Sequence, residues 1–146
     1  MGLGFILVVR GAAVGATQLA DLRDVKIGVP MSTPVDGYLF DNGYDRELYL
    51  GNRRVMKGIA EGEVDAALVW SPNLAVAKQE FPDVDFGVVP GYVPEADLRW
   101  NVAMVLPKDR SDLKRFVDDS IDEMVANGEV KRIVEKYGAP YFPPFE

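Results

Sequence analysis

Short, continuous runs of apolar residues alternate with amphipathic stretches along the chain, and this order constrains the fold more than any other feature. Runs typical of strands lie at 3–10, 25–29, 65–70, 84–89 and 100–106. A strand buried on both faces reads as a continuous apolar run, and strands that alternate with helices build a parallel sheet. The sequence therefore predicts an α/β fold, a mainly parallel sheet with helices on both faces.

The stretches between these runs carry helix signals. Pro34 suits the first turn of a helix that Ser32 or Thr33 would cap. We treat residues 1–146 as a single domain, because this length is typical of one. Further helices are expected over 53–61, 72–79 and 111–138, the last broken at 127–128, with another short strand at 47–50.

The composition excludes several kinds of chemistry. The chain has no cysteine and no histidine, so disulfides, zinc–thiolate sites and Ser-His-Asp catalysis are ruled out. We predict that it is not an enzyme and that it holds no cofactor and no metal. The acidic cluster of Asp118, Asp119, Asp122 and Glu123 is better explained as a solvated helix face than as a cation site. The net charge of −7 disfavours nucleic acid as a partner.

The apolar stretch near the N-terminus is interpreted as a buried strand. No basic residue precedes it, and Arg10 separates it from the small residues after it, which is unlike a signal peptide. It is too short to span a bilayer, and its β-branched and aromatic residues favour a strand. No membrane insertion is therefore expected.

Two loops are candidate ligand-binding segments, because ligands of parallel sheets bind at the carboxyl ends of strands. Ser32 and Thr33 could offer polar groups to a ligand at a helix start, or could simply cap that helix. Trp70 could form an apolar wall, or could belong to the core. The predicted ligand-binding residues are Met31, Ser32, Thr33, Trp70, Ser71 and Pro72.

The order of these segments resembles one family. The stretches LADLRDVKIGVPMSTP, KGIAEGEVDAALVWSP and WNVAMVLPKDRSDLKRFVDDSIDEMVANGEVKRIVEKYG are similar to the second lobe of type II periplasmic solute-binding proteins. The resemblance implies hinge-type strands at 3–10 and 100–106 and C-terminal helices at 111–138. It also implies a first lobe, which would precede Leu3 and which this chain does not contain.

The resemblance also bears on the ligand. In amino-acid-binding members, the strand that corresponds to 65–70 ends in an aspartate that holds the ligand's ammonium group, and here Trp70 stands at that position. A free amino acid is therefore a poor candidate ligand. The Trp-Ser-Pro sequence instead resembles the solute-binding-like proteins associated with quinoprotein alcohol (methanol) dehydrogenases.

Three functions remain open at this point. The first is a non-catalytic periplasmic domain that binds a small solute or serves a quinoprotein dehydrogenase, with a periplasmic location implied by the resemblance. The receptor of an ABC importer, acting with its permease, is a variant of this function. The second is a protein–protein module that forms a homodimer. The third is an enzyme, because cyclohexadienyl dehydratase-like enzymes share the fold.

Overall fold

The computed structural model describes residues 1–145, and its residues form two compact units. Residues 4–99 form the first unit, which holds most of the sheet, whereas residues 1–3 and 100–145 form the second. The sequence predicts that residues 1–146 form one lobe. The predicted C-terminal helices and the whole segment 100–106 belong to the second unit.

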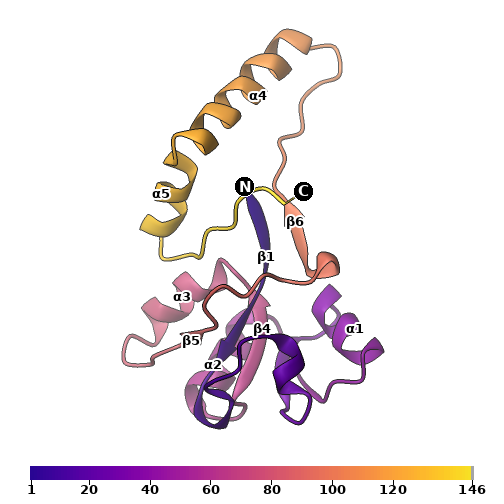
Figure 1. The fold of residues 1–146 in the computed structure, drawn as a ribbon, viewed down its shortest axis with the longest axis vertical. Coiled ribbons are helices and arrows are strands. Elements are labelled where there is room, and N and C mark those ends of the chain that lie inside the picture. Colours follow the sequence, from indigo (N-terminus) through magenta and orange to yellow (C-terminus); the bar gives the residue numbers. More distant parts are fainter. Residues whose placement is uncertain (146) are drawn as a thin grey trace. The chain divides into compact units, whose positions relative to one another are not determined.

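The sheet is mixed, with both parallel and antiparallel pairs of strands, and Figure 1 shows β1 and β4 within it. Its order is β3-β2-β4-β1-β5, where β2 pairs in parallel with β3 and β4, and β1 is antiparallel to β4 and β5. The strands are β1 (Gly2–Val9), β2 (Ile27–Pro30), β3 (Arg46–Tyr49), β4 (Ala66–Trp70), β5 (Gly87–Val88) and β6 (Arg99–Asn101), which also pairs with β1.

Helices cover both faces of the sheet, which confirms the predicted α/β class. Alternate residues of β1 and β4 point to opposite faces. Leu7 and Leu68 join a core cluster with α1 (Pro34–Asp41) and the 3-10 turn Leu19–Leu22. The other face is covered by α2 (Asn52–Glu61) and α3 (Asn73–Glu80), whose Val55, Met56, Ile59, Leu74 and Ala77 are buried.

Local signals place the helix ends as expected. Pro34 occupies the first position of α1, which Thr33 precedes in an extended conformation. Gly62 ends α2 with φ of 76°, in the left-handed region that glycine tolerates without a steric penalty. Gly128, with φ of 77°, separates α4 (Ser111–Ala126) from α5 (Glu129–Lys136). Among residues 1–145, no helix combines the length and apolar character needed to cross a bilayer.

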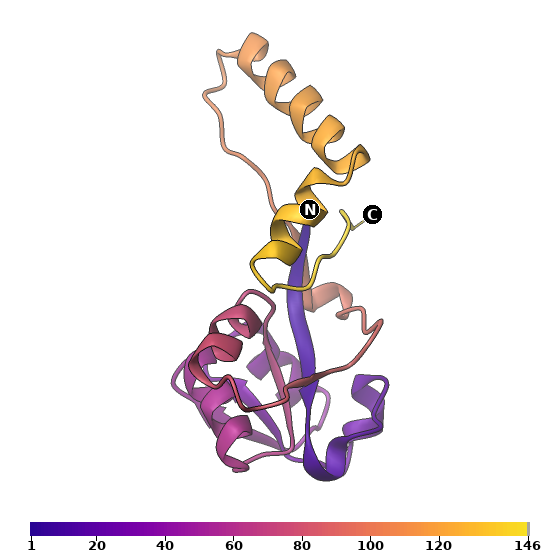
Figure 2. The same ribbon diagram turned by 90° about the vertical axis from the view of Figure 1, so that its left-hand side faces the viewer.

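Two predicted strands are much shorter than expected. The strand expected at 84–89 is limited to Gly87–Val88, and the strand expected at 100–106 is limited to Arg99–Asn101. Residues 102–106 are extended but pair with no strand in the described part of the chain (Figure 2). Both predictions were wrong in length because an apolar run indicates what could pair in a sheet, whereas a strand requires a neighbour that supplies hydrogen bonds.

Candidate functional site

The two predicted ligand-binding loops lie at one edge of the sheet. β2 and β4 run in parallel, with Ile27 opposite Ala66 and Gly28 opposite Ala67, so their carboxyl ends are adjacent. β3 ends beside them, with Tyr49 opposite Pro30. The loops that follow β2, β3 and β4 therefore meet at the position that solute sites occupy in such sheets.

The loop after β2 is held by backbone hydrogen bonds. The Met31 amide donates to the Tyr49 carbonyl at 2.9 Å, and the Met31 side chain remains 43% exposed. Ser32 adopts φ of 59°, which is uncommon for a residue other than glycine. Its side chain is exposed and therefore accessible to a ligand.

A carboxylate of the protein already occupies the start of α1. The Ser32 amide donates to Asp36 Oδ2 at 2.8 Å, and Arg46 Nε donates to Asp36 Oδ1 at 2.7 Å. The Arg46 guanidinium, and after it the Ser32 amide, hold the pKa of Asp36 below its ordinary value of 3.8. A solute anion at this position would compete with Asp36, so the loop is better suited to a neutral or cationic group.

The hydroxyl of Thr33 bonds within its own loop. Its Oγ1 donates to the Pro30 carbonyl at 2.6 Å and makes no hydrogen bond to the first amides of α1. Thr33 therefore fixes the turn between β2 and α1. Its oxygen can still accept a hydrogen bond from a ligand.

Trp70 has a buried side and an accessible side. It can therefore belong to the core, as one interpretation of the sequence has it, and still offer an apolar wall to a ligand, as the other has it. Its indole packs edge to face on the buried Phe5, with 5.7 Å between the ring centroids. Asn52 Oδ1 accepts a hydrogen bond from the Trp70 amide at 2.9 Å, and Asn73 Nδ2 donates to the Trp70 carbonyl at 3.3 Å. The two asparagines, at the starts of α2 and α3, fix the backbone of this wall.

Sequence reasoning missed Asn52 and Asn73. Each stands at the first position of a helix, directly after Gly51 or Pro72. Asparagine side chains near helix starts commonly bond to neighbouring backbone groups. That signal predicts local bonds, but the sequence does not show that both asparagines bond to the same residue.

Ser71 is fully buried, with 0% of its surface exposed. Its amide donates to the Gly4 carbonyl at 3.0 Å, whereas its Oγ has no hydrogen-bond partner among residues 1–145. An unpaired buried hydroxyl is costly. Pro72, the residue before α3, is half-buried. Ser71 therefore lies beneath the surface that Trp70 and Pro72 present.

Three further features concern metals, titratable groups and cavities. Within residues 1–145, no group of three or more acidic residues could hold a metal ion. Burial and a hydrogen bond to Glu63 raise the pKa of Tyr49 to about 12, so this phenol stays protonated. A cavity of about 540 Å³ lies between the end of β1 and β5, and none of the six predicted residues lines it.

Solved structures share this fold. The periplasmic binding protein XoxJ of Methylobacterium extorquens AM1 matches with a TM-score of 0.71 and 23% identity over 97% of this chain. The fold is that of the periplasmic solute-binding proteins. The L-cystine solute receptor of Neisseria gonorrhoeae matches with a TM-score of 0.77 and 18% identity over 93% of the chain. These matches confirm the predicted resemblance at the level of fold.

The likeness covers only part of each binding protein. The chain spans 69% of XoxJ, 56% of the cystine receptor and 61% of the second substrate-binding domain of a putative amino acid ABC transporter from Streptococcus pneumoniae. The last match has a TM-score of 0.70 and 19% identity over 94% of this chain. These shares agree with a likeness to one lobe. No family model and no curated protein matches the chain.

Proposed function

We propose that this chain is a non-catalytic, solute-binding-like domain of the periplasm that forms one wall of a small-molecule site. The observation that carries the proposal is that the loops after β2 and β4 start side by side, with the half-buried Trp70 at the end of β4. The fold supports the same role, because the solved structures that share it are mostly binding proteins. The proposed ligand-binding residues are Met31, Ser32, Thr33, Trp70 and Pro72, and the buried Ser71 would support Trp70 and Pro72 from beneath.

The chemistry of this wall favours a small solute with both an apolar face and neutral or cationic polar groups. Trp70 would stack on the apolar face, and the hydroxyls of Ser32 and Thr33 would meet the polar groups. Asp36 disfavours an anion at the start of α1, because its carboxylate already accepts the Ser32 amide. Met31 would enclose the solute with its exposed side chain.

The chain is proposed to act as an accessory protein to a quinoprotein alcohol dehydrogenase, on the basis of the Trp-Ser-Pro sequence at 70–72. A receptor of an ABC importer is the alternative, which the match to the putative amino acid ABC transporter domain supports. Turnover of a quinoprotein alcohol dehydrogenase, measured with and without the chain, distinguishes the two roles. The accessory role predicts that the added chain changes the turnover of a quinoprotein alcohol dehydrogenase, whereas the receptor role predicts no change.

Catalysis is the weaker alternative. One structure of the same fold is an ancestral cyclohexadienyl dehydratase, with a TM-score of 0.60 and 16% identity. The present chain has no histidine or cysteine, and the carboxylate beside the first loop, Asp36, is paired with Arg46. Turnover of prephenate by the purified chain would overturn the non-catalytic proposal.

Fluorescence of Trp70 tests the site directly. The chain has two tryptophans, so Trp100→Phe leaves Trp70 as the only indole. Titration of this variant with cystine, arginine and the quinone cofactor of quinoprotein dehydrogenases should change the emission with at least one of them. Trp70→Phe, which keeps only Trp100, is the matched control and should show no saturable change. Equal responses of the two variants, or no response from Trp70, would contradict a solute site at this position.

A further inference from the structure

Most backbone donors of the two candidate loops are already bonded within the chain. The amides that donate to other residues are those of Met31, Ser32, Trp70 and Ser71. Pro72 has no amide hydrogen, and the Thr33 hydroxyl donates to the Pro30 carbonyl at 2.6 Å. A ligand carboxylate or carbonyl needs donors, so at these groups it would have to displace bonds that the chain already makes.

Acceptor oxygens remain available at the start of α1. Thr33 Oγ1 donates its own hydrogen and can still accept one, and the hydroxyl of the exposed Ser32 can accept as well. Asp36 adds a charged acceptor. Its two oxygens accept the Ser32 amide at 2.8 Å and Arg46 Nε at 2.7 Å, and a carboxylate offers about four acceptor positions. The loop after β2 therefore suits a ligand group that donates hydrogen bonds.

The charge of Arg46 is engaged within the chain. Arg46 is the first residue of β3, so its backbone lies at the opposite end of this strand from the loops. Its guanidinium carbon lies 4.6 Å from the centre of the Phe40 ring, and its Nε bonds to Asp36. The chain as a whole has a net charge of −7, which favours a cationic solute over an anionic one.

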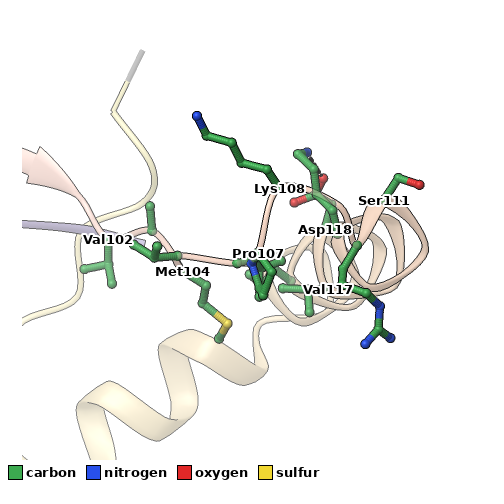
Figure 3. A pocket seen from close by; sticks show the side chains of 13 residues that line it. Val102, Met104, Pro107, Lys108, Ser111, Val117 and Asp118 are labelled. Carbon is green, nitrogen blue, oxygen red and sulfur yellow. Dashed lines mark hydrogen bonds and ion pairs between the residues drawn. The ribbon is translucent and has the colours of Figure 1, made fainter.

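Burial distinguishes Asp36 from Asp118, a carboxylate of the second unit. Asp118 lines a cavity of about 690 Å³ between residues 102–108 and α4 and is paired with Lys114 (Figure 3). The side chain of Asp118 is 51% exposed, whereas that of Asp36 is 16% exposed. Water and salt screen an exposed carboxylate strongly, so the half-buried Asp36 has the larger effect on a group that binds beside it.

We infer that Asp36 determines the charge selectivity of the proposed site, so that the solute presents a protonated amine to the loop after β2 and a carboxylate is rejected there. The amine would donate to Asp36 and to the oxygens of Ser32 and Thr33. A carboxylate would have to displace Asp36 from the Ser32 amide and would lie beside a like charge. The inference rests on the proposed function, because it concerns the same site, and it adds Asp36 as a specificity-determining residue.

Three compounds with the same ring test the inference at pH 7, namely benzylamine, benzyl alcohol and benzoate. Each can stack on Trp70, and they differ only in the polar group. NMR of the ¹⁵N-labelled chain follows the Ser32 amide, and the emission of the Trp100→Phe chain follows Trp70. The wild type should bind benzylamine with a dissociation constant at least about tenfold lower than that for benzoate, with benzyl alcohol between the two.

Variants of Asp36 should remove this selectivity. Asp36→Asn keeps an acceptor oxygen but loses the charge, and the preference for benzylamine over benzoate should fall at least about tenfold. Asp36→Ala frees the Ser32 amide and Arg46, so benzoate should bind it more tightly than it binds the wild type. Asp41→Asn is the matched control, because it removes the same charge from an exposed residue of α1 and should leave the preference unchanged.

Three results would overturn the inference. The first is benzoate that binds the wild type as tightly as benzylamine, and the second is an equal loss of preference in Asp41→Asn. The third is a Ser32 amide that responds to none of the three compounds. The comparison of the three compounds needs only the wild type, so it decides the matter even where a variant fails to fold, which circular dichroism checks.

Failure of this inference is distinguishable from failure of the proposed function. A solute that changes the Trp70 emission without any preference for an amine would leave the solute site in place and remove the role of Asp36. Amine selectivity at the Ser32 amide without a response from Trp70 would keep the role of Asp36 and remove the aromatic wall.

Discussion

The indole of Trp70 meets the phenyl ring of Phe5 edge to face, with 66° between the ring planes. The two residues are opposite each other in the antiparallel pairing of β4 with β1. The antiparallel strand therefore buries one side of Trp70 and leaves the other side at the carboxyl edge of β2 and β4.

Replacing Trp70 should reduce both stability and solute binding. Trp70→Ala removes the contact with Phe5 and should lower the free energy of unfolding by about 2 kcal/mol, less than for a fully buried tryptophan because one side is exposed. Trp70→Phe keeps an aromatic ring beside Phe5, so its free energy of unfolding should fall by less than half as much. Urea denaturation followed by circular dichroism measures both. An alanine variant as stable as the wild type would show that the aromatic contact contributes little.

Removing the Ser71 hydroxyl should not destabilise the chain. Its Oγ is buried without a hydrogen-bond partner in the described part of the chain, so Ser71→Ala should raise the free energy of unfolding by up to about 1 kcal/mol. Thr33→Val is the contrast, because the Thr33 hydroxyl donates to Pro30, and its loss should cost about 1 kcal/mol. Thermal unfolding of the two variants should therefore shift in opposite directions. A clear loss of stability in Ser71→Ala would mean that its hydroxyl has a partner in solution.

The ion pair of Asp36 with Arg46 should make stability depend on pH. The pKa of Asp36 is lower in the folded chain than its ordinary value of 3.8, so ionised Asp36 stabilises the fold. This contribution is fully present above pH 4 or so and is lost as the pH falls through the lower folded pKa. The stability difference between wild type and Asp36→Asn should therefore be largest near neutral pH and vanish in acid. A difference that stays constant down to about pH 2 would contradict this assignment.

Two helical glycines should respond to alanine in opposite ways. In α2, a Cβ at Gly58 would lie 2.7 Å from the Tyr49 hydroxyl oxygen, which bonds to Glu63. Gly58→Ala should therefore cost about 1–2 kcal/mol, in spite of its better helix propensity. In α1, nothing lies within 4 Å of a Cβ at Gly37, so Gly37→Ala should gain about 0.5–1 kcal/mol. Urea midpoints that shift in the same direction would refute the packing argument.

Local signals were sufficient to predict most helices and the sheet class. Pro34 and Gly62 mark helix ends that the structure places within a residue of the prediction. The antiparallel direction of β1 was not predicted, because direction depends on pairing with Ala66–Trp70, far along the chain. The run at 100–106 looks like a strand, but residues 102–106 find no neighbour in residues 1–145.

The candidate site could be predicted only in part. The carboxyl ends of two parallel strands follow from the alternation of strands and helices, and this alternation placed Ser32 and Trp70 at one edge. The sequence could not show that Asp36 bonds to the Ser32 amide or that Ser71 is buried. Both depend on tertiary packing, which changes the groups that each side chain can offer a ligand. The role of the six predicted residues in binding stays a prediction.

The position of β1 between β4 and β5 also limits the order in which the chain can fold. β1 leaves the ribosome before its partner β4, which is made only after β2, β3 and α2. Until then, its apolar run at 5–9 has no strand of this sheet to pair with and remains open to aggregation. A chaperone that protects the nascent chain would therefore be needed most at β1, in the interval before β4 is made.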